Sequence, residues 1–282
     1  MAAGPAAAGR SGPNAEQRAQ WGGDLGLLWA ARAAQFEASA AGYDALLLEA
    51  AELGPGLQVL DVGCGTGSVT RKAAAAVAPG GTATGVDISA PMLQVARDRS
   101  AGLSGVAFLE ADAQVHDFAG RYDRVISRSG VMFFGDPPAA FANLARALRP
   151  GGRVAFVVWR SVAENAWMYE LMRALTGHMP AEPPPGPGAF GLADPERARA
   201  LLVGAGLAEV GVEACAAPVV LGRDVEEAFG LVRQILAGGL EGLGPVDRER
   251  AIAALRAVLA DGAGPDGVAL GSAAWLLTGR AR

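Results

Sequence analysis

The sequence predicts an α/β fold with a doubly wound, mostly parallel sheet, and two observations carry this prediction. Short β-rich runs alternate with helical patterns from residue 58 to residue 160, which is typical of parallel strands joined by right-handed crossover helices. In addition, 51% of the 282 residues are hydrophobic and fall into periodic blocks, so the 40 glycines and 17 prolines do not indicate low complexity. The chain is therefore expected to be globular.

The segment before residue 55 is predicted to precede the core. Residues 1–20 are rich in alanine, glycine and proline and are expected to form a disordered tail. They lack the basic start and apolar run of a signal peptide, which favours a cytoplasmic protein. Residues 21–54 are expected to be helical, because Trp21–Phe36 and Tyr43–Leu53 place leucine, alanine and aromatic residues at helical spacing.

The core, residues 55–160, is predicted to contain five strands with helices between them. The strands are expected at Val59–Val62, Thr82–Val86, Val106–Leu109, Arg124–Ser127 and Val154–Trp159. Ser89 stands at an N-cap position before Pro91, and a later apolar stripe ends at Pro150-Gly151-Gly152. These helix signals indicate that both faces of the sheet are covered.

Residues 161–193 are predicted to form a helical cap after the last of these strands. An amphipathic helix begins near Trp167, and a proline-rich loop follows at Pro180–Pro187. Asp194-Pro195 is typical of the start of another helix.

Two more strand-like runs are expected near the C-terminus, at Val210–Leu221 and Val268–Thr278. Between them, residues 222–265 are predicted to form a helical insertion. The helical pattern runs from Val225 to Leu259 with a break at Gly238–Gly244. This insertion is apolar enough to form a subunit interface, so a homodimer is an alternative to a monomer.

Charge and cysteine content narrow the class of partner. A net charge of -5 and a pI near 5.2 disfavour nucleic acid, which needs a concentrated basic surface, and favour a small-molecule partner. Cys64 and Cys215 have no neighbours at metal-ligand spacing, so no metal site is expected. No apolar run reaches the length of a membrane span.

The most specific segment is Val59-Leu60-Asp61-Val62-Gly63-Cys64-Gly65-Thr66-Gly67. It predicts a buried strand with an acid near its end, followed by three glycines that let a ligand approach the backbone at a helix N-terminus. A nucleotide-type cofactor suits such a loop. The dinucleotide fingerprint would place a glycine or alanine at position 68, but that residue is Ser68, so the spacing fits NAD poorly.

This loop resembles the first motif, D-x-G-x-G-x-G, of the class I S-adenosylmethionine-dependent methyltransferases. Four further segments resemble the family's later motifs in the same order: residues 85–89, 108–113, 122–128 and 149–153. The resemblance implies a Rossmann-like sheet of seven strands whose last strand is antiparallel, and a single domain over residues 21–282. Residues 127–134 and 189–195 look most like the branch related to ubiquinone/menaquinone C-methyltransferases, which acts mostly on small molecules.

The resemblance also implies a set of cofactor-binding residues. The family uses an acid at the end of the second strand for the ribose hydroxyls and an aspartate after the third strand for the adenine amino group, which assigns these roles to Asp87 and Asp112. Asp61 is expected at the cofactor, or as a brace for the glycine loop, and Cys64 is expected to be a small packing residue. The complete expected set is Asp61, Gly63, Cys64, Gly65, Gly67, Asp87, Ile88, Met92, Asp112, Ala113 and Ser127.

Methyl transfer from a sulfonium requires in-line positioning and a poorly solvated pocket rather than a catalytic triad. Aromatic and methionine residues outside the cofactor motifs are therefore candidates for the pocket, although residues of these types at helical spacing are more often plain core. Arg128 and Tyr43 are candidates for orienting a substrate, with a surface ion pair and helix packing as the alternatives. The expected pocket residues are Trp21, Trp29, Arg128, Met132, Phe133, Trp159, Trp167 and Phe190.

A general base is needed only if the acceptor must lose a proton, and histidine suits that role near neutral pH. The chain has two histidines. His178, between the cap helix and the proline-rich loop, is the candidate catalytic residue, with a solvated loop residue as the alternative. His116 follows the adenine-binding segment, which favours a loop residue near the cofactor.

The predicted function is transfer of a methyl group from S-adenosyl-L-methionine to an O, N or C nucleophile of a small, hydrophobic metabolite, of the kind found in secondary metabolism. The product would be S-adenosyl-L-homocysteine. Two alternatives stay open at this point: an NAD(P)-dependent oxidoreductase and a non-catalytic protein that binds S-adenosylmethionine.

Overall fold

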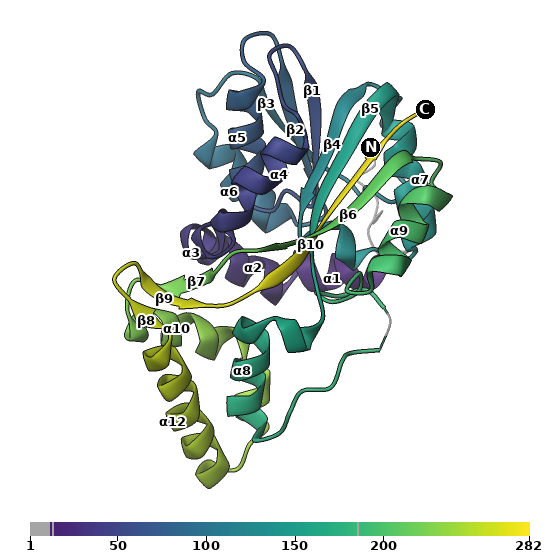
Figure 1. Ribbon diagram of the computed structural model, residues 1–282. Helices are drawn as coiled ribbons and strands as arrows, with labels where there is room; N and C mark the ends of the chain where they lie inside the picture. Colours follow the sequence, from purple (N-terminus) through teal and green to yellow (C-terminus); the bar gives the residue numbers. More distant parts are fainter. Residues whose placement is uncertain (1–11, 13, 185) are drawn as a thin grey trace, which may run out of the picture.

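The computed structural model describes residues 12, 14–184 and 186–282, and a seven-stranded sheet forms its centre (Figure 1). The strand order is β3-β2-β1-β4-β5-β10-β6. β1 to β5 pair in parallel, and β10 runs antiparallel to both β5 and β6, which confirms the predicted fold class. The strands are β1 (Gln58–Val62), β2 (Thr82–Asp87), β3 (Val106–Glu110), β4 (Tyr122–Arg128), β5 (Leu148–Trp159), β6 (Ala208–Ala216) and β10 (Ala273–Arg280).

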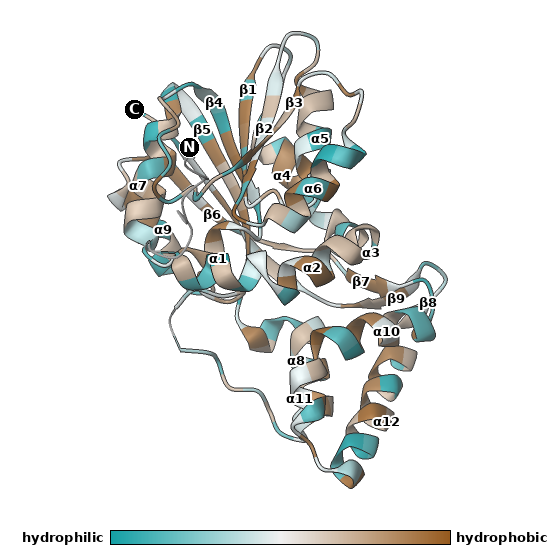
Figure 2. Cartoon of the chain, turned by 180° about the vertical axis from the view of Figure 1, so that it is seen from behind, coloured by the Kyte–Doolittle hydropathy of each residue, from teal (hydrophilic) through white to brown (hydrophobic). Residues whose placement is uncertain are grey.

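Helices cover both faces of this sheet (Figure 1). One face carries α4 (Asp44–Ala50), α5 (Ser68–Ala76) and α6 (Ala90–Arg99), and the other carries α7 (Pro137–Ala147) and α9 (Pro195–Gly204). The middle strands are therefore apolar on both sides, as brown segments of β1 and β5 show in Figure 2. Ser89 precedes α6 as expected, but its hydroxyl donates to the Trp21 carbonyl (2.6 Å) instead of capping the helix.

The N-terminal helices lie across the carboxyl edge of the sheet. They are α1 (Ala15–Gly22), α2 (Asp24–Ala31) and α3 (Ala33–Ser39), followed by the short helix η1 (Ala41–Tyr43). The expectation of a disordered tail over residues 1–20 is therefore wrong for residues 15–20, while residues 1–11 and 13 lie outside the described residues. The reason is tertiary: Asn14 is buried by hydrogen bonds to residues far along the chain.

The two C-terminal strand-like runs each divide into two strands that belong to different sheets. β7 (Val219–Gly222) and β9 (Gly267–Leu270) form a separate antiparallel sheet with β8 (Ala263–Gly264), and only β6 and β10 join the large sheet. Pro218, which lacks an N–H for the ladder, lies between β6 and β7 and divides the first run. The Tyr43 hydroxyl links both breaks, because it accepts a hydrogen bond from the Ala217 N–H (3.1 Å) and bonds the Ser272 hydroxyl (2.7 Å).

Helices from the predicted cap and from the predicted insertion form a lower lobe together with the small sheet (Figure 1). From here on we call this whole lobe the cap. It contains η3 (Val162–Glu164), α8 (Ala166–Thr176), α10 (Val225–Ile235), α11 (Ala237–Glu241) and α12 (Pro245–Asp261). The predicted break at Gly238–Gly244 is only partly correct, since α11 occupies half of it. Within the described residues, no helix is both long and apolar enough to traverse a bilayer.

Candidate functional site

The loop after β1 is built so that only glycine fits at its last position. The Gly63 and Cys64 N–H groups donate to the Val86 carbonyl (2.9 and 3.1 Å), which fixes the loop against β2. Gly67 has φ +80°, and a Cβ there would lie 2.7 Å from the Phe108 ring. Any larger residue would be strained and would collide with this ring. Gly67 directly precedes Ser68, the first residue of α5, so the loop leads into the N-terminus of this helix.

Asp87, the last residue of β2, is tied to this loop through both carboxylate oxygens. Oδ2 accepts from the Gly65 N–H and Oδ1 from the Ser89 N–H, each at 2.8 Å. Burial raises the pKa of the Asp87 carboxyl, and these backbone donors partly offset that effect. A carboxylate oxygen has more than one lone pair, so this side chain can still accept hydrogen bonds from a ligand hydroxyl.

Asp112 follows β3 and faces the same edge. Its Oδ1 accepts from the Gln114 N–H (2.9 Å) and from the Asn14 side-chain amide (2.8 Å). Its Oδ2 accepts no hydrogen bond within the part of the chain that the structure describes, although the residue is only 9% exposed. A buried acceptor with an unused oxygen at the sheet edge suits an amino group of a ligand.

Asp61 lies beneath the loop in a buried polar network. Its carboxylate accepts from the Thr70 hydroxyl of α5 (2.6 Å) and is 1% exposed. Burial raises the pKa of Asp61 to about 7, although the Thr70 hydrogen bond and the positive charge of Arg128 both act to lower it. The contact to Thr70 supports the bracing role, because it joins the end of β1 to the helix that follows the loop.

Arg128 lies in this network and not among the aromatic residues. Its guanidinium donates to Asp44 Oδ1 (2.5 Å), whose other oxygen accepts from Lys72 (2.6 Å). Asp44 is 3% exposed, so this is a buried ion pair rather than the surface pair considered from the sequence. The structure therefore separates Arg128 from the other seven predicted pocket residues.

The rest of the predicted cofactor set lies at the same edge. Burial raises the pKa of the Cys64 thiol well above its usual value, which favours a packing role over thiolate chemistry. The Ser127 hydroxyl donates to the Val62 carbonyl (2.7 Å) and so joins β4 to β1. Met92 and Ala113 are buried, and Ile88 is half-buried beside Asp87.

Five of the predicted pocket residues form two aromatic groups, and Phe133 of the first group belongs to the short helix η2 (Val131–Phe133). In the first group, Trp21 meets Trp29 and Phe133 edge to face at 5.7 and 5.2 Å, and Phe36 stacks on Trp29 at 3.9 Å. In the second group, Trp159 contacts Tyr43 at 5.3 Å and Trp167 at 5.5 Å. Sequence reasoning missed Phe36.

Met132 connects the two groups and the proline-rich loop. The Trp159 N–H donates to its sulfur (3.2 Å), and the Gly188 N–H donates to its carbonyl (3.1 Å). Phe190 follows two residues later and packs half-buried against the core. The end of the proline-rich loop is thereby held beside the carboxyl end of β5, where ligands of open α/β sheets bind.

The structure does not bring the two histidines into this site. His178 is exposed in the loop after α8, in the cap, and its contacts are the backbone interactions with Thr176. His116 stacks edge to face on Phe118 at 4.9 Å, and its carbonyl accepts from Asn143. The loop-residue alternative therefore describes both better than a catalytic role.

Sequence reasoning missed two side chains that hold the N-terminal helices over the loop. Asn14 reaches Asp112 and also accepts from the Gly135 N–H (2.6 Å). Glu37 accepts from the Thr66 hydroxyl (2.6 Å) and pairs with Arg71 at 3.2 Å. The sequence offered one signal: Asn14 with Gln17 three residues later resembles a helix-start box, although the Asn14 side chain makes no capping bond.

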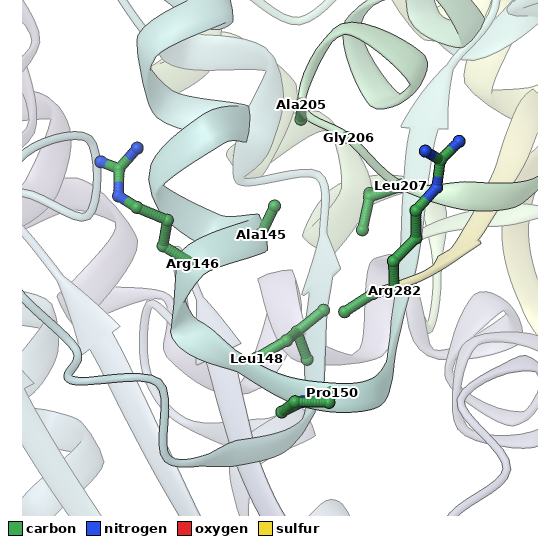
Figure 3. A pocket seen from close by; sticks show the side chains of 9 residues that line it. Ala145, Arg146, Leu148, Pro150, Ala205, Gly206, Leu207 and Arg282 are labelled. Atoms are coloured by element: carbon green, nitrogen blue, oxygen red, sulfur yellow. The ribbon is translucent and has the colours of Figure 1, made fainter.

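A hollow of about 280 Å³ lies at the opposite end of β5 (Figure 3). Its lining includes Leu148 and Pro150 at the start of β5, Leu207 after α9 and the terminal Arg282. It contains none of the predicted site residues. Because parallel strands present their ligands at the carboxyl edge, this hollow is not assigned to the site.

Comparisons with known proteins show which family the residues at this edge resemble. Residues 59–152 match the methyltransferase domain family model. The chain is 41% identical over 111 residues to nocamycin O-methyltransferase of Saccharothrix syringae, a match that covers 38% of this chain and 40% of that protein. It is 38% identical over 111 residues to the ubiquinone/menaquinone biosynthesis C-methyltransferase UbiE of Ectopseudomonas mendocina, covering 38% and 43%. The chain thus spans less than half the length of these two curated relatives.

A solved structure gives the same fold. The Haemonchus contortus phosphoethanolamine N-methyltransferase 2 in complex with S-adenosyl-L-methionine superposes with a TM-score of 0.57 at 18% identity, over 96% of this chain and 60% of that one. At this identity the likeness concerns the fold alone. The match over residues 59–152 identifies a methyltransferase domain there, and the strand order and the glycine loop agree with the fold of the class I S-adenosylmethionine-dependent methyltransferases.

Proposed function

We propose that this protein transfers a methyl group from S-adenosyl-L-methionine to an O, N or C nucleophile of a small, hydrophobic metabolite. One observation carries the proposal. Two buried carboxylates, Asp87 and Asp112, stand at the ends of the adjacent strands β2 and β3, both on the same side of the strand β1 that leads into the glycine loop. This spacing suits an adenosine whose ribose and base each need a separate acceptor.

The residues of the edge fit this cofactor. Asp87 would accept from the ribose hydroxyls, and the unused Oδ2 of Asp112 would accept from the adenine amino group. A Cβ at Gly65 would find no atom nearer than the Met92 sulfur at 3.8 Å, so there is open space beside the loop. A bulky side chain there would reduce the room for a ligand.

The protein's own part in the reaction is to position the acceptor and exclude water. When bound, S-adenosylmethionine supplies a methyl group already activated by the positive sulfonium. The two aromatic groups around Met132 present apolar and π surfaces, which suit a hydrophobic acceptor and a cationic centre that loses its charge. Their place at the carboxyl end of β5 lets them hold an acceptor in line with the cofactor.

The names of the relatives support a small molecule as acceptor. One is a nocamycin O-methyltransferase, and the other is a C-methyltransferase of ubiquinone/menaquinone biosynthesis. The cap lies outside the matched residues and would determine which acceptor fits. No specific observation favours the NAD(P)-dependent alternative, since Ser68 stands where the dinucleotide fingerprint needs a smaller residue.

Methyl transfer itself is tested by incubating the purified protein with methyl-labelled S-adenosylmethionine and a small-molecule extract of the producing organism. We expect label in an organic-soluble product and formation of S-adenosylhomocysteine. A protein that binds the cofactor yet labels no product from any extract would instead be a non-catalytic binder.

Replacement of the ribose acceptor provides the matched test of the cofactor assignment. Asp87→Ala should weaken the binding of S-adenosylhomocysteine by about 1–3 kcal/mol, because hydrogen bonds to a charged group are lost. Asp117→Ala is the control, since Asp117 is exposed and, among the described residues, accepts only from the Ala119 N–H. Equal affinities of the two variants in calorimetry would refute the ribose assignment.

A further inference from the structure

Asn14 stands where a helix cap is expected but uses its side chain elsewhere. It occupies the N-cap position of α1, where asparagine usually accepts a hydrogen bond from a backbone N–H of the first turn. Within the described residues its side chain makes no such bond, and the residue is only 5% exposed. The Asn14 amide is therefore committed to groups outside its own helix.

Two contacts fix both the position and the orientation of this amide. Its oxygen accepts from the Gly135 N–H (2.6 Å), and its nitrogen donates to Asp112 Oδ1 (2.8 Å). A backbone N–H can only donate, so the amide oxygen must face Gly135 and the amide nitrogen must face Asp112. Asn14 thus presents a donor to the carboxylate.

The other end of α1 is also tied to the cofactor edge. The Trp21 carbonyl accepts from the Ser89 hydroxyl (2.6 Å), and the Ser89 N–H donates to Asp87 Oδ1 (2.8 Å). α1 is therefore connected to Asp112 at its start and, through Ser89, to Asp87 at its end. These two connections hold Asn14 at a fixed place beside the Asp112 carboxylate.

The effect of Asn14 is on one oxygen of Asp112. Oδ1 accepts from the Asn14 amide and from the Gln114 N–H (2.9 Å). The Gln114 bond is a local one, and a carboxylate held by it alone can still turn, because this side-chain torsion has broad minima. The second donor comes from a distant part of the chain and restricts that rotation. Oδ2, which accepts from none of the described residues, is thereby held for a ligand.

A fixed Oδ2 can distinguish one purine from another. The amino group of adenine donates to it, whereas the carbonyl oxygen that hypoxanthine carries at the same ring position would face it as a second acceptor. We propose that Asn14 is a positioning residue, which acts through Asp112 to make the site select adenine over hypoxanthine. This inference rests on the proposed function.

The proposal is tested with two probes that differ only at this ring position, S-adenosylhomocysteine and S-inosylhomocysteine. The wild-type protein should bind the adenosyl compound more tightly. In Asn14→Ala the affinity for S-adenosylhomocysteine should fall about tenfold, the scale for a hydrogen bond to a charged group, while the affinity for S-inosylhomocysteine stays unchanged. A general disturbance of α1 would weaken both probes, because they share the ribose and the amino-acid end.

Two further variants separate the amide donor from its surroundings. Asn14→Asp keeps the shape and the acceptor for the Gly135 N–H, but it places a second carboxylate against Asp112. Its selectivity should therefore fall at least as far as that of Asn14→Ala. Glu16→Ala changes an exposed residue in the first turn of the same helix and should leave both affinities unchanged. Calorimetry on folded variants, checked by thermal unfolding, provides these values.

A double-mutant cycle tests whether Asn14 acts through Asp112. In an Asp112→Ala background the carboxylate that Asn14 orients is gone, so Asn14→Ala should change the selectivity no further. A further loss of selectivity in that background would show that Asn14 contacts the base itself, and it would overturn the positioning role.

The remaining outcomes separate this inference from the proposed function. Equal losses for both probes in Asn14→Ala, or no loss for either, would leave Asn14 without a part in selectivity. Tighter binding of S-adenosylhomocysteine by Asn14→Ala would show that Asn14 blocks the site. Each of these results would overturn the inference alone, whereas a wild-type protein that binds neither probe would overturn the proposed function as well.

Discussion

The cofactor edge and the cap are held together by different forces. At the edge, buried carboxylates have specific polar partners: Asp61 has Thr70, Asp87 has Gly65, and Asp44 has Arg128 and Lys72. In the cap, α8 and α12 pack through apolar residues such as Leu171 and Leu255, and the ion pairs are exposed. Single substitutions of charged residues should therefore matter at the edge and hardly at all in the cap.

This difference matches the two tasks that the proposed function assigns to the molecule. A site that recognises one cofactor must place hydrogen-bonding groups accurately, and buried networks fix their positions. A cap that selects an acceptor needs shape more than charge, and apolar packing tolerates substitution as long as volume is kept. The following experiments compare matched positions in the two regions.

The largest effect is expected for the ion pairs. Arg128→Ala leaves the buried Asp44 with only one cationic partner and should lower the free energy of unfolding by about 3 kcal/mol. Arg173→Ala in the cap breaks an exposed pair with Glu170 and should leave the stability unchanged. Urea unfolding of both variants measures the difference, and similar losses would show that the two regions are not held differently.

Two glycines with nearly the same positive φ provide the second comparison. Gly67 (φ +80°) lies against the Phe108 ring, whereas a Cβ on Gly177 (φ +74°), at the end of α8, would meet nothing within 4 Å. Gly67→Ala should cost roughly 2 kcal/mol from strain and overpacking, and Gly177→Ala about 1 kcal/mol from strain alone. Thermal unfolding should rank the two variants in this order; the reverse ranking would contradict the close contact at Phe108.

The raised pKa of Asp61, about 7, predicts a pH dependence of stability. Its ordinary value lies near 3.8, so the native state retains a proton that the unfolded chain has lost, and stability falls as pH rises between about 4 and 7. Asp61→Asn should remove this fall, which has a slope of at most about 1.4 kcal/mol per pH unit. Unfolding midpoints at pH 5 and pH 8 test this: wild type and variant must differ in slope, and parallel curves would exclude the assignment.

The smallest effect is expected at His178. Because this side chain is exposed and in the cap, His178→Ala should leave both cofactor affinity and the rate of methyl transfer near the wild-type values. The rate is measured with labelled cofactor once an extract yields a product. A rate loss of tenfold or more with unchanged affinity would restore the histidine as a catalytic residue.

The same contrast explains what the sequence could predict. The strands of the core were predicted because local periodicity determines them, and the antiparallel last strand was expected from the resemblance to the methyltransferase family. The division of Val210–Leu221 into β6 and β7 was not, since a strand pattern does not say which sheet a strand joins. Asn14 and Arg128 were placed wrongly because their partners, Asp112 and Asp44, lie 98 and 84 positions away.

Selective cofactor binding tests the central claim most directly. Calorimetric titration of the wild-type protein with S-adenosylmethionine, S-adenosylhomocysteine, NADH and NADPH should give saturable one-site binding for the first two and no binding for the nicotinamide cofactors. Tight binding of NADH or NADPH, without a response to either adenosyl compound, would contradict the assignment of the glycine loop, Asp87 and Asp112.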